Sequence, residues 1–390
     1  MIVRYFRNVL LCAYFLASFN KVSFAQPANA VNALNGPANR IHTAVPFLNI
    51  VTDSRVAAMG EAGVATAPDA NSPSINPAKL SFLNKDAGVG LFYSPWLKSL
   101  VDQVDLLYLS GYYKLNADNT ISASLRYFSM GSVQLTSGAE QDLGRYHPSE
   151  FSIDASYIKK MSNNFSLATT LKYIRSNVIT AETFGDLFQV GSAVAVDVSG
   201  YFQIPVNLHA MDGFFSTGFN ISNVGSKLQY AKQGQSYPLP SNLKLGTAYR
   251  IVPDNFNQFT IAMDFNKLLV PLKYQESQSV SSGIFSSLTD APGGFKEELS
   301  EISLSFGLEY KYKQAFALRG GYMYEDPKKG DRRYLTMGGG FSKDAFSVDL
   351  AYILADVQRS PFANTIRLTI LLNFGDRIKG SYENKSRFRF

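Results

Sequence analysis

The sequence predicts an all-β fold, a 14-stranded antiparallel transmembrane β-barrel with an N-terminal plug inside its lumen. Three observations lead to this prediction. From Ala87 onward, apolar and polar residues alternate with a period of two in segment after segment, which is the pattern of strands buried on one face. The connections between these segments alternate between short and long. The chain also opens with an export signal.

Composition excludes several classes of protein. Hydrophobic residues make up 46% of the 390 residues and charged residues 17%, which is too apolar for a disordered chain. The mean hydropathy is −0.06 and no run of 18 apolar residues occurs, so a polytopic helical membrane protein is excluded. The net charge of +6 arises at the two ends of the chain, so the main domain has no basic surface for nucleic acid.

Residues 1–25 are predicted to be a signal peptide. Arg4 and Arg7 precede an apolar stretch, Val9–Phe19, and a cleavage site with small residues follows it, ending at Ala25. The alternative is a short transmembrane anchor, which the length disfavours because the stretch is too short to cross about 30 Å of hydrocarbon as a helix. The only cysteine, Cys12, lies in this stretch, so the mature chain has neither a thiol nucleophile nor a disulfide.

Two segments precede the barrel. Residues 26–45 are rich in Ala, Asn and Pro and are expected to be extended. Residues 46–84, the plug, are rich in small residues and glycine, which allow close backbone packing in a confined space. Pro77 disfavours a helix at Asn76. We expect this segment to fill the lumen, because a barrel of this size would otherwise leave a wide hole.

The barrel is expected to occupy residues 85–374. Its strands are predicted at 87–94, 103–115, 119–129, 149–160, 164–176, 190–204, 213–223, 241–251, 257–267, 300–311, 315–325, 331–341, 345–355 and 363–374. Most of these segments reach the roughly 9–11 residues that a tilted strand needs to cross a bilayer. The turn predicted at Pro205–Asp212 is longer than the other turns of its set and fits this pattern least well.

The connections predict which way the barrel faces. Those at 116–118, 161–163, 253–256, 312–314 and 342–344 are tight, and those at 130–148, 177–189, 224–240 and 268–299 are long. Outer-membrane barrels have short periplasmic turns and long extracellular loops. An even number of strands then places both termini in the periplasm. Residues 375–390 form a basic periplasmic tail, either a solvated extension or a contact for anionic lipid or a periplasmic partner.

Charged residues recur on the polar face of the strands. These residues are Arg126, Asp154, Lys172, Asp197, Lys244, Arg250, Asp264, Glu309, Arg319, Asp349 and Arg367. We expect them to be solvated or paired with one another inside the barrel; an ion or substrate relay is the alternative. Tyrosines near the segment ends suit interfacial girdles.

An enzymatic role is not predicted. The sequence has three histidines, and their spacing is not that of metal ligands. His42 lies in the segment before the plug, His147 in a long loop and His209 in a turn. Gly338–Gly340 with Lys343 lacks the spacing of a phosphate loop. We interpret these glycines as a kinked strand or as a place where the plug approaches the wall. Neither a cofactor nor a metal is expected.

The plug carries a family resemblance. Its pattern Arg-x-x-x-Met-Gly-x-x-Gly-Val-Ala, followed by Asp-Ala-x-Ser and Asn-Pro-Ala-x-Leu, resembles the N-terminal hatch of FadL-type fatty acid transporters, which are 14-stranded barrels. The matching residues include Arg55, Met59, Gly60, Gly63, Asp69, Asn76 and Pro77. Thr43–Asn49, with Asp69–Asn71 before Asn76–Lys79, resembles more closely the PorV family, FadL-like outer-membrane subunits of the type IX secretion system of Bacteroidota.

The resemblance implies a non-enzymatic role in protein export. PorV-like proteins hold the C-terminal signal domain of a cargo protein as it leaves the type IX translocon, a large outer-membrane barrel. They then pass it to a sortase-like attachment complex at the cell surface. The implied partners are therefore cargo domains, the translocon, that complex, and outer-membrane lipid or lipopolysaccharide. The alternative is a FadL-like channel for fatty acids or other hydrophobic small molecules, with the hatch as its gate.

Apolar residues in two long connections are candidates for partner binding. An exposed apolar loop suggests a docking surface, and tryptophan is favoured at binding hot spots. The candidates are Trp96 and Leu97 in one connection and Leu268, Leu269, Val270, Ile284 and Phe285 in the other. For Trp96, an interfacial anchor in lipid is the alternative.

Overall fold

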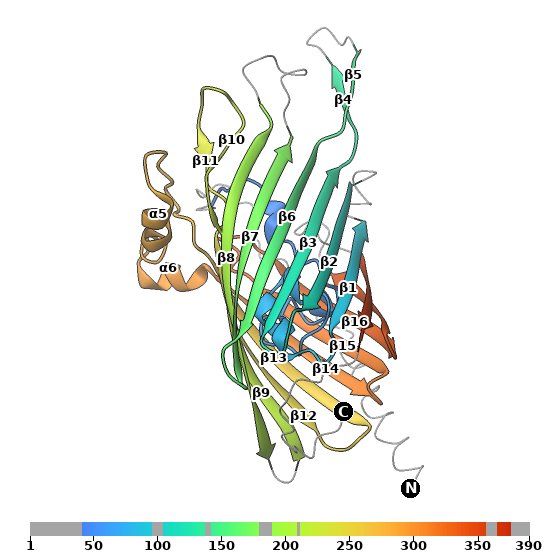
Figure 1. Cartoon of the computed structure of the whole chain (residues 1–390). Helices are drawn as coiled ribbons and strands as arrows, with labels where there is room; N and C mark the ends of the chain where they lie inside the picture. The colour runs from blue at the N-terminus through green and yellow to red at the C-terminus, as the bar shows by residue number, and fades with distance from the viewer. Residues whose placement is uncertain are drawn as a thin grey trace, which may run out of the picture. The chain divides into compact units, whose positions relative to one another are not determined.

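The computed structural model describes residues 41–95, 104–136, 142–178, 189–208, 211–355 and 365–375. Within these residues, fourteen antiparallel strands form a closed barrel (Figure 1). The barrel strands are β1 (Ala87–Pro95), β2 (Val104–Lys114), β3 (Asn119–Met130), β6 (Ser149–Lys160), β7 (Phe165–Asn177), β8 (Gly191–Leu208), β9 (Met211–Gly225), β12 (Asn242–Val252), β13 (Asn257–Leu268), β14 (Ile302–Tyr312), β15 (Phe316–Tyr324), β16 (Arg333–Lys343), β17 (Phe346–Leu354) and β18 (Ile366–Phe374). No helix in the described residues is long and apolar enough to cross a membrane.

The strand order confirms the predicted fold. Each strand pairs with its neighbours in the chain, and β1 closes the ring against β18, with Ala87 opposite Phe374. The turn predicted at Pro205–Asp212 is wrong, because β8 and β9 continue pairing as far as Leu208 and Met211. Proline removes its own N–H but keeps an extended φ, so the pairing continues past it at the end of β8.

The two faces of the strands differ in polarity. On β13, Phe259 and Phe265 point outward and are 45% and 42% exposed, whereas the alternate residues Thr260 and Asp264 are buried. The other barrel strands show the same alternation. An apolar outer surface around a polar interior is the reverse of a water-soluble protein and suits a barrel in lipid, which must close because hydrocarbon offers backbone groups no partner.

The two ends of the barrel have different connections. At one end the strands join by tight turns; in one of them Lys313 and Gln314 have φ angles of 53° and 55°, and type I′ turns need such positive values. At the other end the connections contain secondary structure of their own. These elements are the hairpin strands β4 (Val133–Thr136), β5 (Asp142–Tyr146), β10 (Leu228–Gln229) and β11 (Ser236–Tyr237), and the helices α5 (Val280–Ser286) and α6 (Phe295–Ser300).

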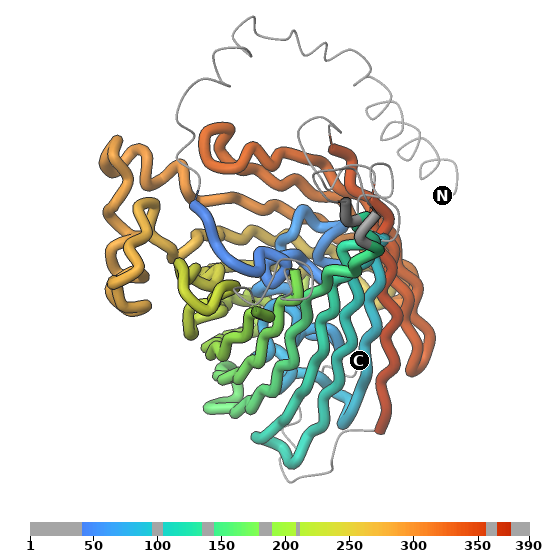
Figure 2. The backbone as a smooth tube through the Cα atoms, turned by 90° about the horizontal axis from the view of Figure 1, so that it is seen from above, coloured from blue at the N-terminus to red at the C-terminus, as the bar shows by residue number. Residues whose placement is uncertain are grey.

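The plug lies within the ring of strands (Figure 2). Its elements are η1 (Pro46–Asn49), α3 (Ser54–Ala58), η2 (Ser72–Ser74) and η3 (Pro77–Phe82). Just before the plug, the Ala44 amide donates to the Pro238 carbonyl, in a long connection, at 2.9 Å. Just after it, the Asp86 amide donates to the Phe374 carbonyl at 3.1 Å, at the tight-turn end. The chain therefore crosses the barrel before its first strand begins.

The position of the chain ends stays a prediction. Residues 1–40 and 376–390 lie outside the described residues. The described chain begins near the long connections and ends at the tight turns.

Candidate functional site

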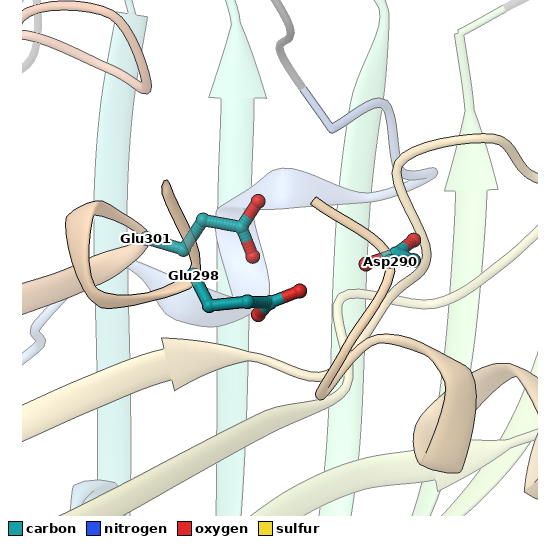
Figure 3. Close-up of side chains that lie close together, drawn as sticks. All are labelled: Asp290, Glu298 and Glu301. Carbon is teal, nitrogen blue, oxygen red and sulfur yellow. The ribbon is translucent and has the colours of Figure 1, made fainter. Parts of the chain in front are cut away.

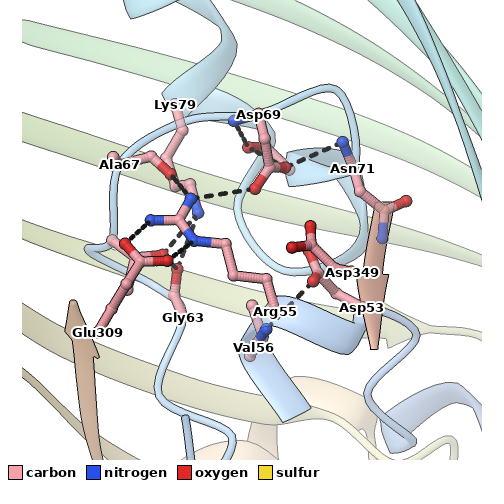
Figure 4. A network of polar contacts seen from close by, with 12 residues as sticks. Asp53, Arg55, Val56, Gly63, Ala67, Asp69, Asn71, Lys79, Glu309 and Asp349 are labelled. Carbon is pink, nitrogen blue, oxygen red and sulfur yellow. Dashed lines mark hydrogen bonds and ion pairs between the residues drawn. The ribbon is translucent and has the colours of Figure 1, made fainter. Parts of the chain in front are cut away.

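A buried arginine attaches the plug to the barrel wall. Arg55 lies in α3, whose N-terminus is capped by Asp53, because the Asp53 carboxylate accepts from the Val56 amide at 3.1 Å. Arg55 Nε and Nη2 each donate to the Glu309 carboxylate at 2.9 Å, a bidentate pair (Figure 4). Its Nη1 also reaches Asp69 at 3.2 Å, so one guanidinium joins two parts of the plug to β14.

The ion-pair network continues along the wall. Arg319 on β15 donates to Glu309 at 2.8 Å and to Asp349 on β17 at 2.5 Å. Elsewhere on the wall, Lys172 pairs with Asp197 at 2.6 Å. These charges are paired with one another, as expected for the interior. Buried charges are tolerated only when they are paired and hydrogen-bonded, so Arg55, which joins this network through Glu309, fixes the plug against the wall.

Glycines let the plug backbone touch the wall. Gly60 has a φ of 64°, and a Cβ there would lie 2.5 Å from the Tyr322 amide nitrogen. On the wall, a Cβ at Gly307 would lie 2.5 Å from the Met59 carbonyl oxygen, and one at Gly338 would lie 2.5 Å from the Ala58 Cβ. Only glycine fits such approaches. Of the two interpretations of the glycine run, the close approach of plug and wall is therefore observed at Gly338, whereas the atoms nearest to a Cβ at Gly339 or Gly340 belong to the wall itself.

The remaining motif residues hold the plug's own shape and its contacts with β13 and β8. Asp264 on β13 accepts from the Gly63 and Val64 amides at 2.7 and 2.9 Å. Asn76 Nδ2 donates to the carbonyls of Val64 and Gly200, each at 3.0 Å, and its Oδ1 accepts from the Ala78 amide. Pro77 opens the η3 helix, where its missing N–H is not needed. All seven motif residues thus lie in the lumen.

Arg126 holds the beginning of the plug, a role that the sequence did not predict. From β3, its Nη1 donates to the carbonyls of Phe47 and Ile50 at 3.1 Å and to that of Leu48, and its Nη2 donates to Thr52 Oγ1 at 3.2 Å. The alternating pattern placed Arg126 on the inner face, but nothing in the sequence identifies backbone carbonyls as the partners.

A cavity of about 420 Å³ lies at the long-loop side of the plug. Its apolar lining includes Phe47, Ile50 and Phe128, and its polar lining includes Lys244 and Asp264. It is therefore amphipathic, and it lies against the segment that Arg126 holds.

The predicted docking residues differ in their exposure. Leu269 and Val270 are buried in the β13–β14 connection, whereas Phe285 on α5 is 73% exposed. Leu268 and Ile284 are half-buried. Trp96 and Leu97 lie outside the described residues. The structure therefore leaves Phe285 as the most exposed of the candidates in the β13–β14 connection.

Three carboxylates gather in that connection (Figure 3). Oxygens of Asp290, Glu298 and Glu301 lie within 4.8 Å of one another. Lys267 Nζ donates to Glu298 at 2.9 Å and to Glu301 at 2.7 Å. Burial opposes ionisation of Glu298, but the Ala291 amide and Lys267 outweigh it and lower the pKa of this carboxyl. The cluster thus already holds an ammonium group, and it fixes α6 in place.

The two histidines in the described part of the chain belong to none of these networks. His42 and His147 are exposed, and His209 lies outside the described residues.

A search of curated proteins found no match to this chain. The solved structures similar to it include the toluene transporter TodX of Pseudomonas putida (15% identity, 82% of this chain and 95% of that one, TM-score 0.43). They also include the toluene transporter TbuX of Ralstonia pickettii (10%, 84% and 100%, 0.43) and a FadL homologue of Pseudomonas aeruginosa (11%, 83% and 98%, 0.44).

The family assignment comes from the sequence profile of the type IX secretion system protein PorV, which matches residues 34–275. That span covers the plug and the barrel as far as β13. The chain belongs to the PorV family of type IX secretion system proteins.

Proposed function

We propose that this outer-membrane barrel binds the C-terminal signal domain of secreted cargo at the type IX translocon and passes it to the sortase-like attachment complex at the cell surface. The proposal rests on family membership and on one structural observation, the attachment of the plug to the wall. A barrel with a fixed plug is suited to binding at its mouth rather than to free passage.

The plug is tied to the wall on several sides. Arg55 binds Glu309 on β14, the Gly63 and Val64 amides bind Asp264 on β13, and Asn76 binds the Gly200 carbonyl on β8. Removing the plug would leave buried charges without partners, which costs several kcal/mol for each buried pair. The energetic balance therefore favours a plug that stays in place.

The mouth offers a surface for cargo. The amphipathic cavity opens among the long connections, and the segment Pro46–Asn49 lines it from the plug side. We propose that cargo docks over this mouth, with Ile284, and with Trp96 and Leu97 in the β1–β2 connection, as further candidate contacts. We also propose that residues 375–390 extend into the periplasm, because Phe374 lies at the tight-turn end.

Complementation of a deletion strain tests this function. The reporter is a secreted protein fused to a C-terminal signal domain, followed to the cell surface. Ser303→Trp with Ser305→Trp would fill the cavity, since both small side chains are buried in its lining. We expect this variant to leave the reporter in the periplasm, while the matched control Thr169→Trp, at an exposed wall position, restores export. Export that continues in the deletion strain would reject the proposal.

A second function, uptake of fatty acids or other hydrophobic molecules, is favoured by one observation. The cavity combines apolar walls with the Lys244 side chain, a partner for a carboxylate. Lys244→Met would then lower fatty acid uptake while leaving export of the reporter intact. Equal uptake by the deletion and parent strains would exclude this function.

A further inference from the structure

Helix α6 is attached to the outside of the barrel wall. Lys267 has the outward orientation of its strand, two residues beyond Phe265 on β13. Its ammonium group is covered by Glu298 and Glu301 of α6, and its side chain is only 11% exposed. An outward-facing lysine that is covered by a helix places that helix beside the wall, and Glu301, just after the helix, also lines the cavity at the mouth of the lumen. Figures 1 and 2 show α5 and α6 outside the ring of strands.

A second lysine fixes the orientation of α6. Lys329, in the β15–β16 connection, donates to Glu297 at 2.8 Å and to Glu301 at 2.9 Å. Three carboxylates of one short helix therefore face two lysines of the barrel. At 100° per residue, Phe295 and Leu299 lie together on the other side of the helix.

The side of α6 away from these lysines is apolar and exposed. Phe295 is 78% exposed and Leu299 51%; on and just after α5, Phe285 is 73% exposed and Leu288 46%. Lys296, beside Phe295, is exposed as well. Large apolar side chains gathered in one polar connection indicate a surface that another phase or molecule covers.

This surface continues the lipid-facing belt of the barrel. Phe265 and Leu304 are register partners, and they are the last exposed apolar residues of β13 and β14 at this end of the strands. Helix α6 ends at Ser300, two residues before β14 begins. Aromatic and apolar residues with lysine at the edge of such a belt are typical of a segment that lies in the membrane interface.

We propose that the α5–α6 connection is a segment that lies in the membrane interface. It places four apolar side chains among the outer-leaflet lipids: Phe285, Leu288, Phe295 and Leu299. The occupant of this surface is lipid, because Lys267 holds α6 to the wall only two residues beyond Phe265 of the lipid-facing belt, while the apolar side of the helix faces away from the wall. Lys296 meets the lipid phosphates. This role is independent of the secretion function and would hold equally for an uptake channel.

Depth-dependent fluorescence quenching tests the proposal on the full chain in lipid vesicles. Trp96→Phe removes the only native tryptophan, and Phe295→Trp then reports on α6. In phosphatidylcholine brominated at acyl carbons 6 and 7, we expect blue-shifted emission and quenching at least about half that of Phe265→Trp in the belt, since interfacial helices bury their apolar face roughly 5–10 Å deep. Tyr237→Trp, on the β10–β11 hairpin, should stay unquenched.

The outcomes separate the possible occupants. Red-shifted, unquenched tryptophan emission from Phe295→Trp, the same result that is expected for Tyr237→Trp, would overturn the proposal. So would quenching that disappears when a cargo signal domain is added, because the surface would then belong to protein. Phe285→Trp repeats the test if Phe295→Trp fails to give the heat-modifiable band of a folded barrel.

Discussion

Arg55 and Glu309 are 254 residues apart in the chain, and yet they form two parallel hydrogen bonds of 2.9 Å in the buried centre of the barrel. One residue belongs to the plug and the other to the wall. Their contact makes the position of the plug a property of the whole barrel, and the first prediction follows from it.

Arg55→Met alone should destabilise the protein strongly. It leaves Glu309 buried with one of its two arginine partners missing, and breaking a buried pair costs about 3–5 kcal/mol. Arg55→Met with Glu309→Met should cost less, because Arg319 and Asp349 still pair with each other. Thermal unfolding in detergent, read by heat modifiability, measures both. Equal losses in the single and double variants would contradict a pairwise role.

Gly60→Ala should displace the plug from the wall. The residue has a φ of 64° and its Cβ would meet the backbone of β15 at 2.5 Å, so strain and overpacking together exceed about 1 kcal/mol. Conductance in planar bilayers should rise as the plug loosens. The control is Gly339→Ala, whose Cβ would make an ordinary contact at 3.5 Å with the Ala317 carbonyl oxygen. Unchanged conductance in the Gly60→Ala variant would show that the plug tolerates a shift.

Arg126→Met should free the first part of the plug while leaving the barrel closed. Its guanidinium holds the carbonyls of Phe47 and Ile50, so their loss removes several charge-assisted bonds at once. Hydrogen exchange in a peptide spanning residues 44–53 should speed up at least about tenfold, because charge-assisted bonds contribute about 1.5–3 kcal/mol each. Arg145→Met on the exposed β5 hairpin strand serves as the control. Unchanged hydrogen exchange in residues 44–53 would show that Arg126 does not hold the beginning of the plug.

The attachment of α6 should depend on pH at both extremes. The Glu298 pKa is lowered from 4.5, so its contribution is present above pH 4.5 and is lost as pH falls through the lowered value. Burial of Lys329 is outweighed by Glu297 and Glu301, which raise its pKa above 10.5, so its contribution is lost only above that pH. A spin label at residue 295 should therefore be least mobile between about pH 5 and pH 10.

A variant tests which group causes the loosening of α6 at low pH. Lys267→Gln removes the ammonium that lowers the Glu298 pKa, so the loosening of α6 should begin at a higher pH. If α6 loosens at the same low pH in this variant as in the parent protein, the loosening belongs to another group.

The sequence predicted the barrel well because the bilayer imposes a simple rule on each strand. A residue must face either lipid or lumen, so Phe259 and Thr260 reveal their faces by polarity alone. The rule weakens outside the bilayer, where β8 and β9 continue past Pro205 without an apolar belt to mark them.

The contacts of the plug could not be predicted in the same way. Its small residues indicated close packing, and Gly60 shows why. The partner of Arg55, however, is set by the register of strands far along the chain, and local sequence carries no trace of it. Lys267 is the opposite case, since it has the outward orientation of its strand but is covered by a helix from the next connection.

The path of residues 44–86 through the barrel bears on how the protein is assembled. A segment that passes from one end of the barrel to the other must already lie within the curved sheet when β1 pairs with β18. Otherwise the folded plug would have to be threaded through the closed barrel afterwards. Joining the first and last strands is thus the biogenesis step that captures the plug. A lesion in Gly60 or Arg55 should accordingly appear in cells as barrels stalled on the insertion machinery.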